Sequence, residues 1–431
     1  MKNKVLAIII PCLSLTGCIF DKHKPDIIKE ASQNLRRNVN VNTTAFTLKT
    51  ALNEFGADFA SKAFESDSDI TKNKVVSPIS MFSVLSVAAE CSANNTQTEI
   101  LNALHTDLNA LTSEFPYLYS AANVTRTVGR SDSKIVKKEL LTNSIWLDDS
   151  VSFKQTMVDK IAEDFYCYAM NAKFRSNPSE TNKQMSSFVE DKTDGLIKPE
   201  FSFDENTFFT ILNTLYFKSL WYIEADNIDK TDVEYDFVNR DGSIDTRKLF
   251  KTKLQTGKVL KREKYSSFFA ETCSNDRIKF IVPNDGFSLE NVINRESILD
   301  VLNEDYEGLD LENNICYRNY TYFPGFEAEQ KLSSNSILSN LEINDLFNNK
   351  CDFSGLTDAN VICGDIEHVA KLKVDKKGIE GAAYTVVPLN GASGPLEVTY
   401  IDGEFIVDKS FYYIVCDSNN LPLFSGVVNK I

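Results

Sequence analysis

The most informative stretch of the chain lies near its C-terminus and reads Lys376-Lys377-Gly378-Ile379-Glu380-Gly381-Ala382-Ala383-Tyr384-Thr385-Val386-Val387, followed by Pro388-Leu389-Asn390-Gly391-Ala392-Ser393-Gly394-Pro395. Its first half predicts a strand, because small and β-branched residues fit between two neighbouring strands whose backbones approach closely. Its second half is rich in Gly, Pro, Asn and Ser, which predicts an exposed loop that proteases can cleave. The sequence therefore joins a narrow strand to a cleavable loop.

Separate motifs precede this stretch in a fixed order. Asn73-Lys74-Val75-Val76-Ser77-Pro78-Ile79-Ser80 predicts the start of a helix, because a proline in the first helical turn lacks only an N–H that is not needed there. A strand-like apolar run then contains Asn213-Thr214-Leu215-Tyr216-Phe217-Lys218-Ser219-Leu220-Trp221, and Phe323-Pro324-Gly325-Phe326 follows it. Ile366-Glu367-His368-Val369 predicts a strand that leads into the C-terminal stretch.

In order and spacing these motifs resemble those of the serpin family. The resemblance covers residues 45–431, without an internal repeat or a linker, and so implies a single serpin domain. Within it, apolar residues at helical spacing predict an amphipathic first helix over residues 45–65. The implied fold is α+β, with three β-sheets, about eight or nine helices and an exposed reactive-centre loop at about residues 376–400.

The serpin hinge has the pattern Glu-Glu-Gly-Thr-Glu-Ala-Ala-Ala-Ala-Thr, which aligns with residues 376–385. This chain matches the pattern at Gly378, Glu380, Ala382, Ala383 and Thr385. It departs from the pattern at Lys376 and Lys377, which replace acids, at Ile379, which replaces Thr, and at Gly381 and Tyr384, which replace Ala. In the family the first acid usually anchors the hinge by an ion pair. With Lys376 at that position, either the partner is reversed too or the anchor is missing.

The resemblance implies an inhibitor rather than an enzyme. A protease would attack the loop and form an acyl-enzyme, and the cleaved loop would then insert into the main sheet as a new strand. Because successive strand residues face opposite sides, an inward Ile379 makes Gly381, Ala383, Thr385 and Val387 inward too. All five can be buried, which favours inhibition. The alternative is a binding or structural serpin that never inserts its loop.

The family's spacing, carried forward from Lys376, places the reactive bond at Ala392-Ser393. A small Ala before the bond favours serine proteases of the elastase or subtilisin kind, and papain-like cysteine proteases are a further candidate class. The segment from Ser393 to Phe411 is longer than usual by several residues, so Leu389-Asn390 is a competing bond. The expected partner is the target protease in a covalent complex, and we expect a monomer.

The sequence offers no set of residues typical of an enzyme, a cofactor site or a metal site. It contains only three histidines, and it lacks the motifs of serine hydrolases, zinc proteases and phosphate-binding loops. In serpins the histidine that matches His368 lies beneath the opening of the main sheet. We therefore expect His368 to contact Ser77 or Ser80. Pro78 and Ser186, which stands where Asn is usual, belong to the same implied sheet-opening region.

The N-terminus predicts export. A basic start precedes an apolar run from Val5 to Leu15 that is too short to span a bilayer, so residues 1–17 are expected to be a signal peptide. Leu15-Thr16-Gly17-Cys18 resembles a bacterial lipobox, which implies a lipidated Cys18 that carries palmitate and anchors the protein to the lipid bilayer of the outer membrane or cell surface. The alternative is an ordinary secretory signal with an incidental Cys18.

The segment that follows the anchor is polar and weakly periodic, so residues 18–44 are expected to form a flexible tether. The formal net charge of the whole chain is -15 at pH 7. Because nucleic acids are polyanions, this charge argues against nucleic-acid binding.

Overall fold

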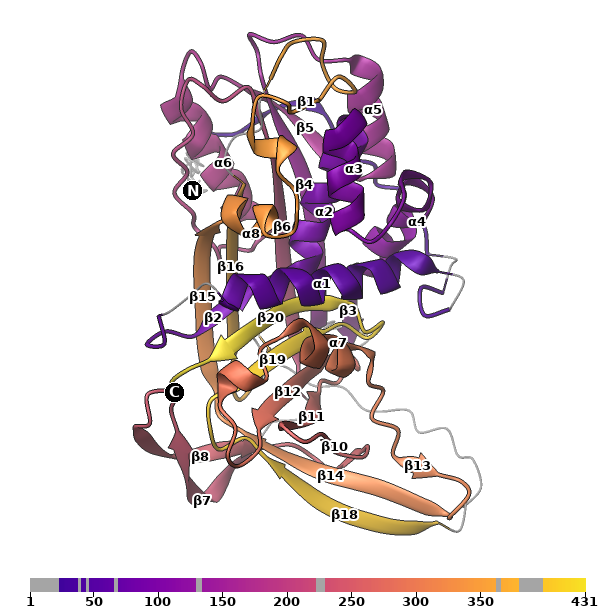
Figure 1. Cartoon of the computed structure of the whole chain (residues 1–431), viewed down its shortest axis with the longest axis vertical. Coiled ribbons are helices and arrows are strands. Elements are labelled where there is room, and N and C mark those ends of the chain that lie inside the picture. The colour runs from indigo at the N-terminus through magenta and orange to yellow at the C-terminus, as the bar shows by residue number, and fades with distance from the viewer. Residues whose placement is uncertain are drawn as a thin grey trace, which may run out of the picture.

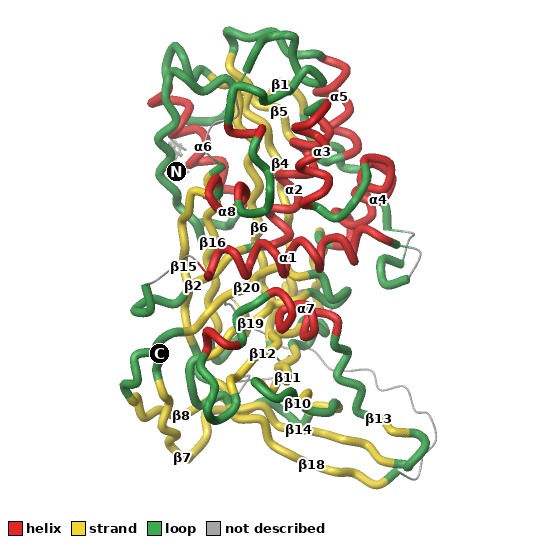
Figure 2. The backbone as a smooth tube through the Cα atoms, viewed as in Figure 1, coloured by secondary structure: helices red, strands yellow, loops and turns green. Residues whose placement is uncertain are grey.

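A computed structural model describes residues 23–37, 40–43, 46–65, 69–128, 134–221, 229–361, 366–379 and 398–431. Three β-sheets form the framework, and helices gather around the upper part of the molecule in Figure 1. Figure 2 shows that strands run along most of the long axis. The three sheets and the eight α-helices of the described residues agree with the α+β architecture predicted from the sequence.

The main sheet has eight strands. β4 and β5 are parallel, and the other neighbours are antiparallel. In spatial order the sheet contains β1 (Asp26–Lys29), β5 (Cys167–Ala172), β4 (Lys134–Asp148), β6 (Phe209–Leu220), β17 (Gly378–Ile379), β16 (Glu367–Val374) and β15 (Phe326–Ser333), and β3 (Asn123–Val128) pairs with β4.

Two smaller sheets complete the framework. The buried sheet runs β10 (Leu260–Lys261), β11 (Tyr265–Glu271), β12 (Arg277–Pro283), β19 (Phe411–Cys416), β20 (Pro422–Val428) and β2 (Lys74–Val76). The end sheet runs β13 (Leu309–Asp310), β14 (Ile315–Phe323), β8 (Ile244–Lys251) and β7 (Asp229–Val238), and both β18 (Thr399–Ile406) and β9 (Gln255–Thr256) pair with β14. All side chains of β19 and β20 are buried, because this sheet is covered on both faces.

The helices pack against the main and buried sheets. They are α1 (Thr47–Glu65), α2 (Pro78–Cys91), α3 (Asn94–Ala103), α4 (Leu108–Ala121), α5 (Gln155–Asp164), α6 (Pro178–Lys192), α7 (Arg295–Asn303) and α8 (Asn335–Ser339), with short 3-10 turns η1 (Leu289–Asn291) and η2 (Asp345–Phe347). Every residue of α2 is buried, and the helix begins at Pro78 as the sequence predicts. Phe55 and Phe59 of α1 are fully buried, which confirms the amphipathic first helix. Among the described residues, no helix is both long and apolar enough to cross a bilayer.

The segment from 23 to 37 lies against the domain, whereas the sequence predicted a flexible tether over residues 18–44. β1 pairs with β5 at the outer edge of the main sheet, where an open strand edge offers backbone partners. Lys29 forms an ion pair of 2.7 Å with Asp159 on α5, and the backbone N–H of Arg36 donates to the Ser120 hydroxyl on α4 at 2.7 Å. A polar sequence does not reveal such pairing, which depends on a distant strand.

The extra length after the reactive loop forms a strand. β18 pairs in parallel with β14 over eight consecutive positions, from Ile315 and Thr399 to Tyr322 and Ile406. The two strands extend the end sheet outward at the end of the long axis opposite β1, β5 and α5 (Figure 1). The additional residues therefore lengthen the end sheet.

Candidate functional site

The hinge enters the main sheet between β6 and β16. Gly378 lies opposite Leu220 and Ile379 opposite Ser219 on β6, while Ile379 also lies opposite Val374 on β16. No pairing joins β6 directly to β16, so among described residues only Gly378 and Ile379 occupy the position between them. The first two residues of a strand at this position are therefore already in register.

Gly378 is required by the close approach of the two backbones. A Cβ atom at this position would lie 2.3 Å from the carbonyl oxygen of Ser219 and 3.0 Å from the Cα atom of Leu220. Both neighbours are backbone atoms of a paired strand, which cannot move aside as a flexible side chain can. Steric contact with β6 therefore explains why position 378 is a glycine.

The turn that leads into the hinge is anchored by Trp221 and by Asp375. The indole N–H of Trp221 donates to the Asp375 carbonyl at 2.7 Å, and the Trp221 backbone N–H donates to the Lys377 carbonyl at 3.1 Å. The Asp375 carboxylate accepts from the Lys377 N–H at 2.8 Å. No ion pair joins Lys376 or Lys377 to another described residue. Backbone and indole hydrogen bonds thus hold the hinge where the family usually uses a charged pair.

Ile379 is fully buried and packs in the main hydrophobic core. This confirms the inward orientation on which the predicted alternation depends. The remaining hinge residues Glu380, Gly381, Ala382, Ala383, Tyr384 and Thr385, the reactive bond at Ala392 and Ser393, and the lipidation site Cys18 lie outside the described residues. Their roles stay predictions.

His368 makes the contact expected from the sequence. Its Nε2 accepts a hydrogen bond of 2.9 Å from the backbone N–H of Ser77, just before the helix that begins at Pro78. The Ser77 hydroxyl donates to the Leu423 carbonyl at 2.7 Å and lies 2.9 Å from the Ser80 hydroxyl. Burial lowers the pKa of His368 to about 4, so the ring is neutral at physiological pH and carries its proton on Nδ1.

Ser186 does not reach this cluster. Its hydroxyl donates to the Asn182 carbonyl one turn earlier in α6, at 2.9 Å. A longer Asn at this position would extend further from the helix. Replacement of the usual Asn by Ser186 therefore shortens the reach of this side chain. The amide oxygen of Asn213 and the hydroxyl of Thr214, on β6, are instead buried without a hydrogen-bond partner among the described residues.

Asn213, Thr214 and His368 line a cavity of about 30 Å³ between β6, β16 and α2. Such a volume holds about one water molecule. In the sequence Asn213 was only one position of a motif, and its buried amide at this cavity was not predicted. A lone amide in an apolar strand was the signal that could have revealed it.

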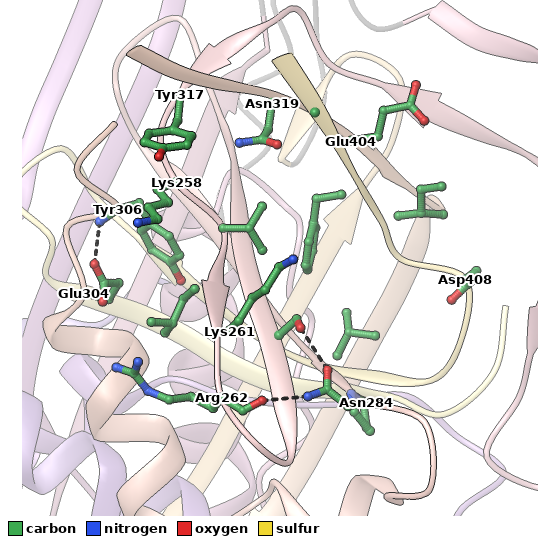
Figure 3. A pocket seen from close by; sticks show the side chains of 18 of the residues that line it. Lys258, Lys261, Arg262, Asn284, Glu304, Tyr306, Tyr317, Asn319, Glu404 and Asp408 are labelled. Atoms are coloured by element: carbon green, nitrogen blue, oxygen red, sulfur yellow. Dashed lines mark hydrogen bonds between the residues drawn. The ribbon is translucent and has the colours of Figure 1, made fainter. Parts of the chain in front are cut away.

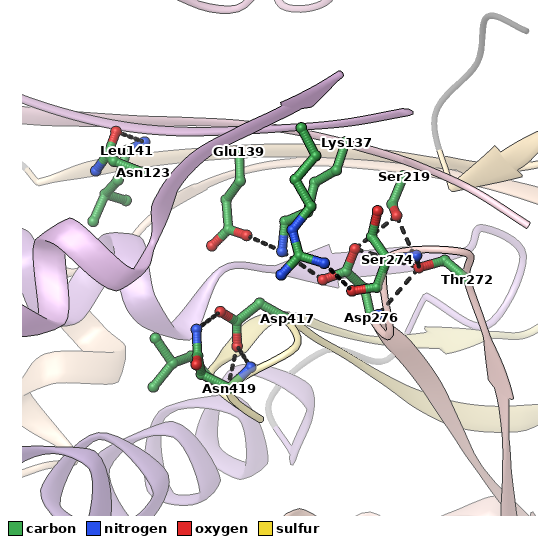
Figure 4. A network of polar contacts seen from close by, with 12 residues as sticks. Asn123, Lys137, Glu139, Leu141, Ser219, Thr272, Ser274, Asp276, Asp417 and Asn419 are labelled. Carbon is green, nitrogen blue, oxygen red and sulfur yellow. Dashed lines mark hydrogen bonds and ion pairs between the residues drawn. The ribbon is translucent and has the colours of Figure 1, made fainter. Parts of the chain in front are cut away.

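A buried ionic network joins β4, β6 and the turn before β12 (Figure 4). The Lys137 ammonium contacts Asp276 at 2.5 Å and Glu139 at 2.8 Å, and the Ser219 hydroxyl donates to Asp276 at 2.6 Å. Burial raises the pKa of Glu139 to about 8 and also raises the pKa of Asp417 nearby. Burial disfavours the charge of Lys137, but Glu139 and Asp276 outweigh it and raise the Lys137 pKa.

The network touches the hinge through Ser219, which lies opposite both Lys137 and Ile379. Sequence reading missed it, although Lys137-Lys138-Glu139 places charges inside a mostly buried strand.

A separate hollow lies between the β10 edge of the buried sheet and β18 of the end sheet (Figure 3). Its volume is about 1060 Å³. Several lining side chains are already engaged, since Arg262 pairs with Asp300, Lys409 with Asp285, and Tyr306 with Ser267. None of the described hinge residues, 376–379, lines this hollow.

Comparisons with known proteins agree with this geometry. Residues 50–431 match the sequence model of the family described as Serpin (serine protease inhibitor). The alpha-1-antiproteinase of Rattus norvegicus is 25% identical over 372 residues, which cover 83% of each chain. Two solved structures share the fold. The thermophilic serpin tengpin in its native state has a TM-score of 0.71 and 21% identity and covers 95% of this chain and 100% of its own. Human thyroxine-binding globulin complexed with thyroxine has a TM-score of 0.71 and 18% identity over 90% of this chain and 99% of its own.

Proposed function

Because this chain belongs to the serpin family, we propose that it inhibits serine endopeptidases as a suicide substrate. A protease cleaves the loop and forms an ester with the residue before the cleaved bond. The hinge then continues the strand that Gly378 and Ile379 begin and carries the protease with it before the ester is hydrolysed. Inhibition of serine proteases is the activity named for the family, and the trapping mechanism and the targets are our proposal.

The match between the loop sequence and the two flanking strands carries this proposal. If the pairing of Ile379 with Ser219 and Val374 continues residue by residue, Thr385 lies opposite Asn213 on β6 and His368 on β16. The Asn213 amide oxygen is buried and has no donor among the described residues, and His368 accepts at Nε2, which makes its Nδ1–H a donor. A hydroxyl both donates and accepts, so Thr385 would satisfy both groups.

The other inward residues meet apolar partners in the same register. Continued in this way, the register would place Gly381 between Phe217 and Leu372, Ala383 between Leu215 and Ala370, and Val387 between Ile211 and Ile366. Thr385, which is polar, would therefore lie between the polar residues Asn213 and His368. Gly381, Ala383 and Val387 would each lie between two apolar residues. Burial of these side chains and new ladder hydrogen bonds would drive insertion.

The outward face is complementary as well. The same register places Glu380 between Lys218 and Lys373, so an acidic side chain would lie between two cations. Lys373 already forms an ion pair of 2.9 Å with Glu327 on β15. The Tyr384 side chain would lie beside Thr214 and Val369, which line the cavity of about 30 Å³.

The reactive bond Ala392-Ser393 favours proteases whose pocket accepts a small side chain, such as elastase or subtilisin, and papain-like cysteine proteases form a second candidate class. Leu389-Asn390 remains the competing bond. The candidate alternative is a serpin that binds without inserting its loop.

We also propose that Cys18 is lipidated and anchors the chain to the cell envelope of a bacterium. His23 lies five positions after Cys18 in the sequence, and its ring contacts Glu180 on α6 at 3.0 Å. The end sheet lies at the opposite end of the long axis from β1 and α5 (Figure 1). The lipid anchor would therefore lie far from the end sheet. Palmitate labelling that disappears in Cys18→Ala tests this point.

The central experiment incubates the purified protein with elastase, subtilisin and papain and separates the products on denaturing gels. A detergent-resistant band at the combined mass supports trapping. Cleavage without such a band, together with an unchanged melting temperature of the cleaved protein, would overturn both inhibition and insertion.

A further inference from the structure

The end sheet carries an aromatic and charged surface on β14 and β18, which we call the end-sheet face. Tyr400 is 55% exposed on β18, and Tyr320 is half-buried further along β14, where it lies opposite Glu404. Because alternate strand residues share a face, Tyr400, Asp402 and Glu404 lie on the same side as Arg318, Tyr320 and Tyr322.

The side chains of the end-sheet face are held in place by one another. Arg318 forms a bidentate pair with Asp402 at 2.7 and 2.9 Å, and its guanidinium lies 4.0 Å from the centre of the Tyr400 ring. The Lys251 ammonium lies 4.2 Å from the centre of the Tyr320 ring, over the same face. Ordered tyrosines that remain exposed lose little conformational entropy on binding, which is why they are enriched at interfaces.

The end-sheet face lies close in sequence to the reactive bond. Thr399 lies six positions after Ser393, and this stretch spans at most about 21 Å even when fully extended. The start of β18 is fixed, because the Thr399 N–H donates to the Asn314 carbonyl at 2.7 Å. A protease domain of about 200 residues has a radius of gyration of about 16 Å. A protease that holds the reactive bond in its active site therefore extends over the first residues of β18.

We propose that the end-sheet face is a second contact surface for the target protease, with Tyr400 and Tyr320 as its main contacts. It binds the protease surface beside the part of the active-site cleft that receives the residues after the cleaved bond. This inference rests on the proposed function, because the occupant is the protease that attacks the loop. The contact forms before cleavage, so it speeds recognition and does not change the fate of the acyl-enzyme.

Variants of Tyr400 and Tyr320 test the contact in the full chain. The probes are elastase and subtilisin whose nucleophilic serine is replaced by alanine, so that binding is measured without cleavage. Tyr400→Ala combined with Tyr320→Ala should weaken the Kd for at least one probe by about tenfold and slow inhibition by the active enzyme by a similar factor. The number of inhibitor molecules consumed per protease should not change.

Leu311→Ala is the matched control, because Leu311 is 64% exposed in the turn between β13 and β14 and does not belong to either β14 or β18. Tyr400→Phe, which keeps the ring, should retain most of the affinity. Equal melting temperatures show that the variants are folded.

Three results overturn the inference: a Kd changed less than twofold in the double variant, no measurable binding of either probe by the wild type, or a change of self-association alone. Failure of the proposed function looks different. In that case the inactive probes still bind and still depend on Tyr400, but the active proteases form no covalent complex.

Discussion

Ile379 lies directly opposite Ser219 on one side and Val374 on the other, with its side chain fully buried. If the cleaved loop continued this strand as we propose, the two antiparallel registers would place Thr385 opposite Asn213 and His368, and Glu380 opposite Lys218 and Lys373. The loop sequence would then be complementary to the flanking strands on both faces.

Gly378→Ala should displace the hinge from β6, because the added Cβ would lie 2.3 Å from the Ser219 carbonyl oxygen. We expect faster hydrogen exchange at the backbone amides of the hinge and a lower yield of covalent complex. Lys376→Ala, in the same turn but exposed, is the control and should leave both quantities near wild type. Unchanged exchange in Gly378→Ala would show that the hinge does not need this close approach.

His368 should make the native state sensitive to acid. Its folded pKa of about 4 lies below the ordinary value of 6.5, so its contribution to stability is full above pH 6.5 and is lost as pH falls through 4. The loss is up to about 3 kcal/mol. The melting temperature should fall more between pH 7 and pH 4.5 in the wild type than in His368→Gln. The exposed-site variant His105→Gln should behave like the wild type, and equal pH slopes for all three proteins would contradict the buried neutral ring.

Glu139 should make the native state less stable at alkaline pH. Its folded pKa of about 8 lies above the ordinary 4.5, so the stability it contributes is full below pH 4.5 and is lost as pH rises through 8. Glu139→Gln cannot ionise and should therefore melt at a higher temperature than the wild type at pH 9, with little difference at pH 5. Glu329→Gln, at an exposed ion pair with Lys371, is the matched control. A wild type that is more stable than Glu139→Gln at pH 9 would refute the raised pKa.

Glu380→Lys should impair trapping, because the register would place three cations side by side on β6, the inserted strand and β16. We expect more protease-cleaved inhibitor per covalent complex than in the wild type, with Glu380→Gln in between. High salt should reduce the difference, because it screens partly exposed charges. If Glu380→Lys and Glu380→Gln trap equally well at low salt, Glu380 does not lie between Lys218 and Lys373.

The sequence predicted the fold, because the fold depends on local patterns and on ordered motifs. An inward Ile379 was the premise of the predicted alternation, and its burial agrees with that premise. The sequence also predicted the contact between His368 and Ser77, but only through resemblance to the family. Because Lys376 replaces the usual acid, the sequence did not show what anchors the hinge. In the structure the Trp221 indole donates to the Asp375 carbonyl, and no pattern along the chain reveals this hydrogen bond. Long-range hydrogen bonds of this kind depend on the packing of distant elements.

Other parts could not be predicted for the same physical reason. β1 forms because a strand edge is open beside it, so its polar sequence gave no sign of pairing. Lys137 and Glu139 are buried together with Asp276, more than 130 residues away in sequence. Ser186 was expected near the sheet opening, but its short side chain bonds to its own helix, and Asn213 supplies the open polar group instead.

The most direct test of loop insertion is the yield of covalent complex formed by variants of Thr385 with elastase or subtilisin on a denaturing gel. Thr385→Ser keeps the hydroxyl and should trap the protease like the wild type, whereas Thr385→Val should trap less because Asn213 and His368 stay unsatisfied. Thr385→Arg would bury a charge and should give cleaved inhibitor alone. A Thr385→Arg variant that traps as efficiently as the wild type would contradict insertion of the loop between β6 and β16.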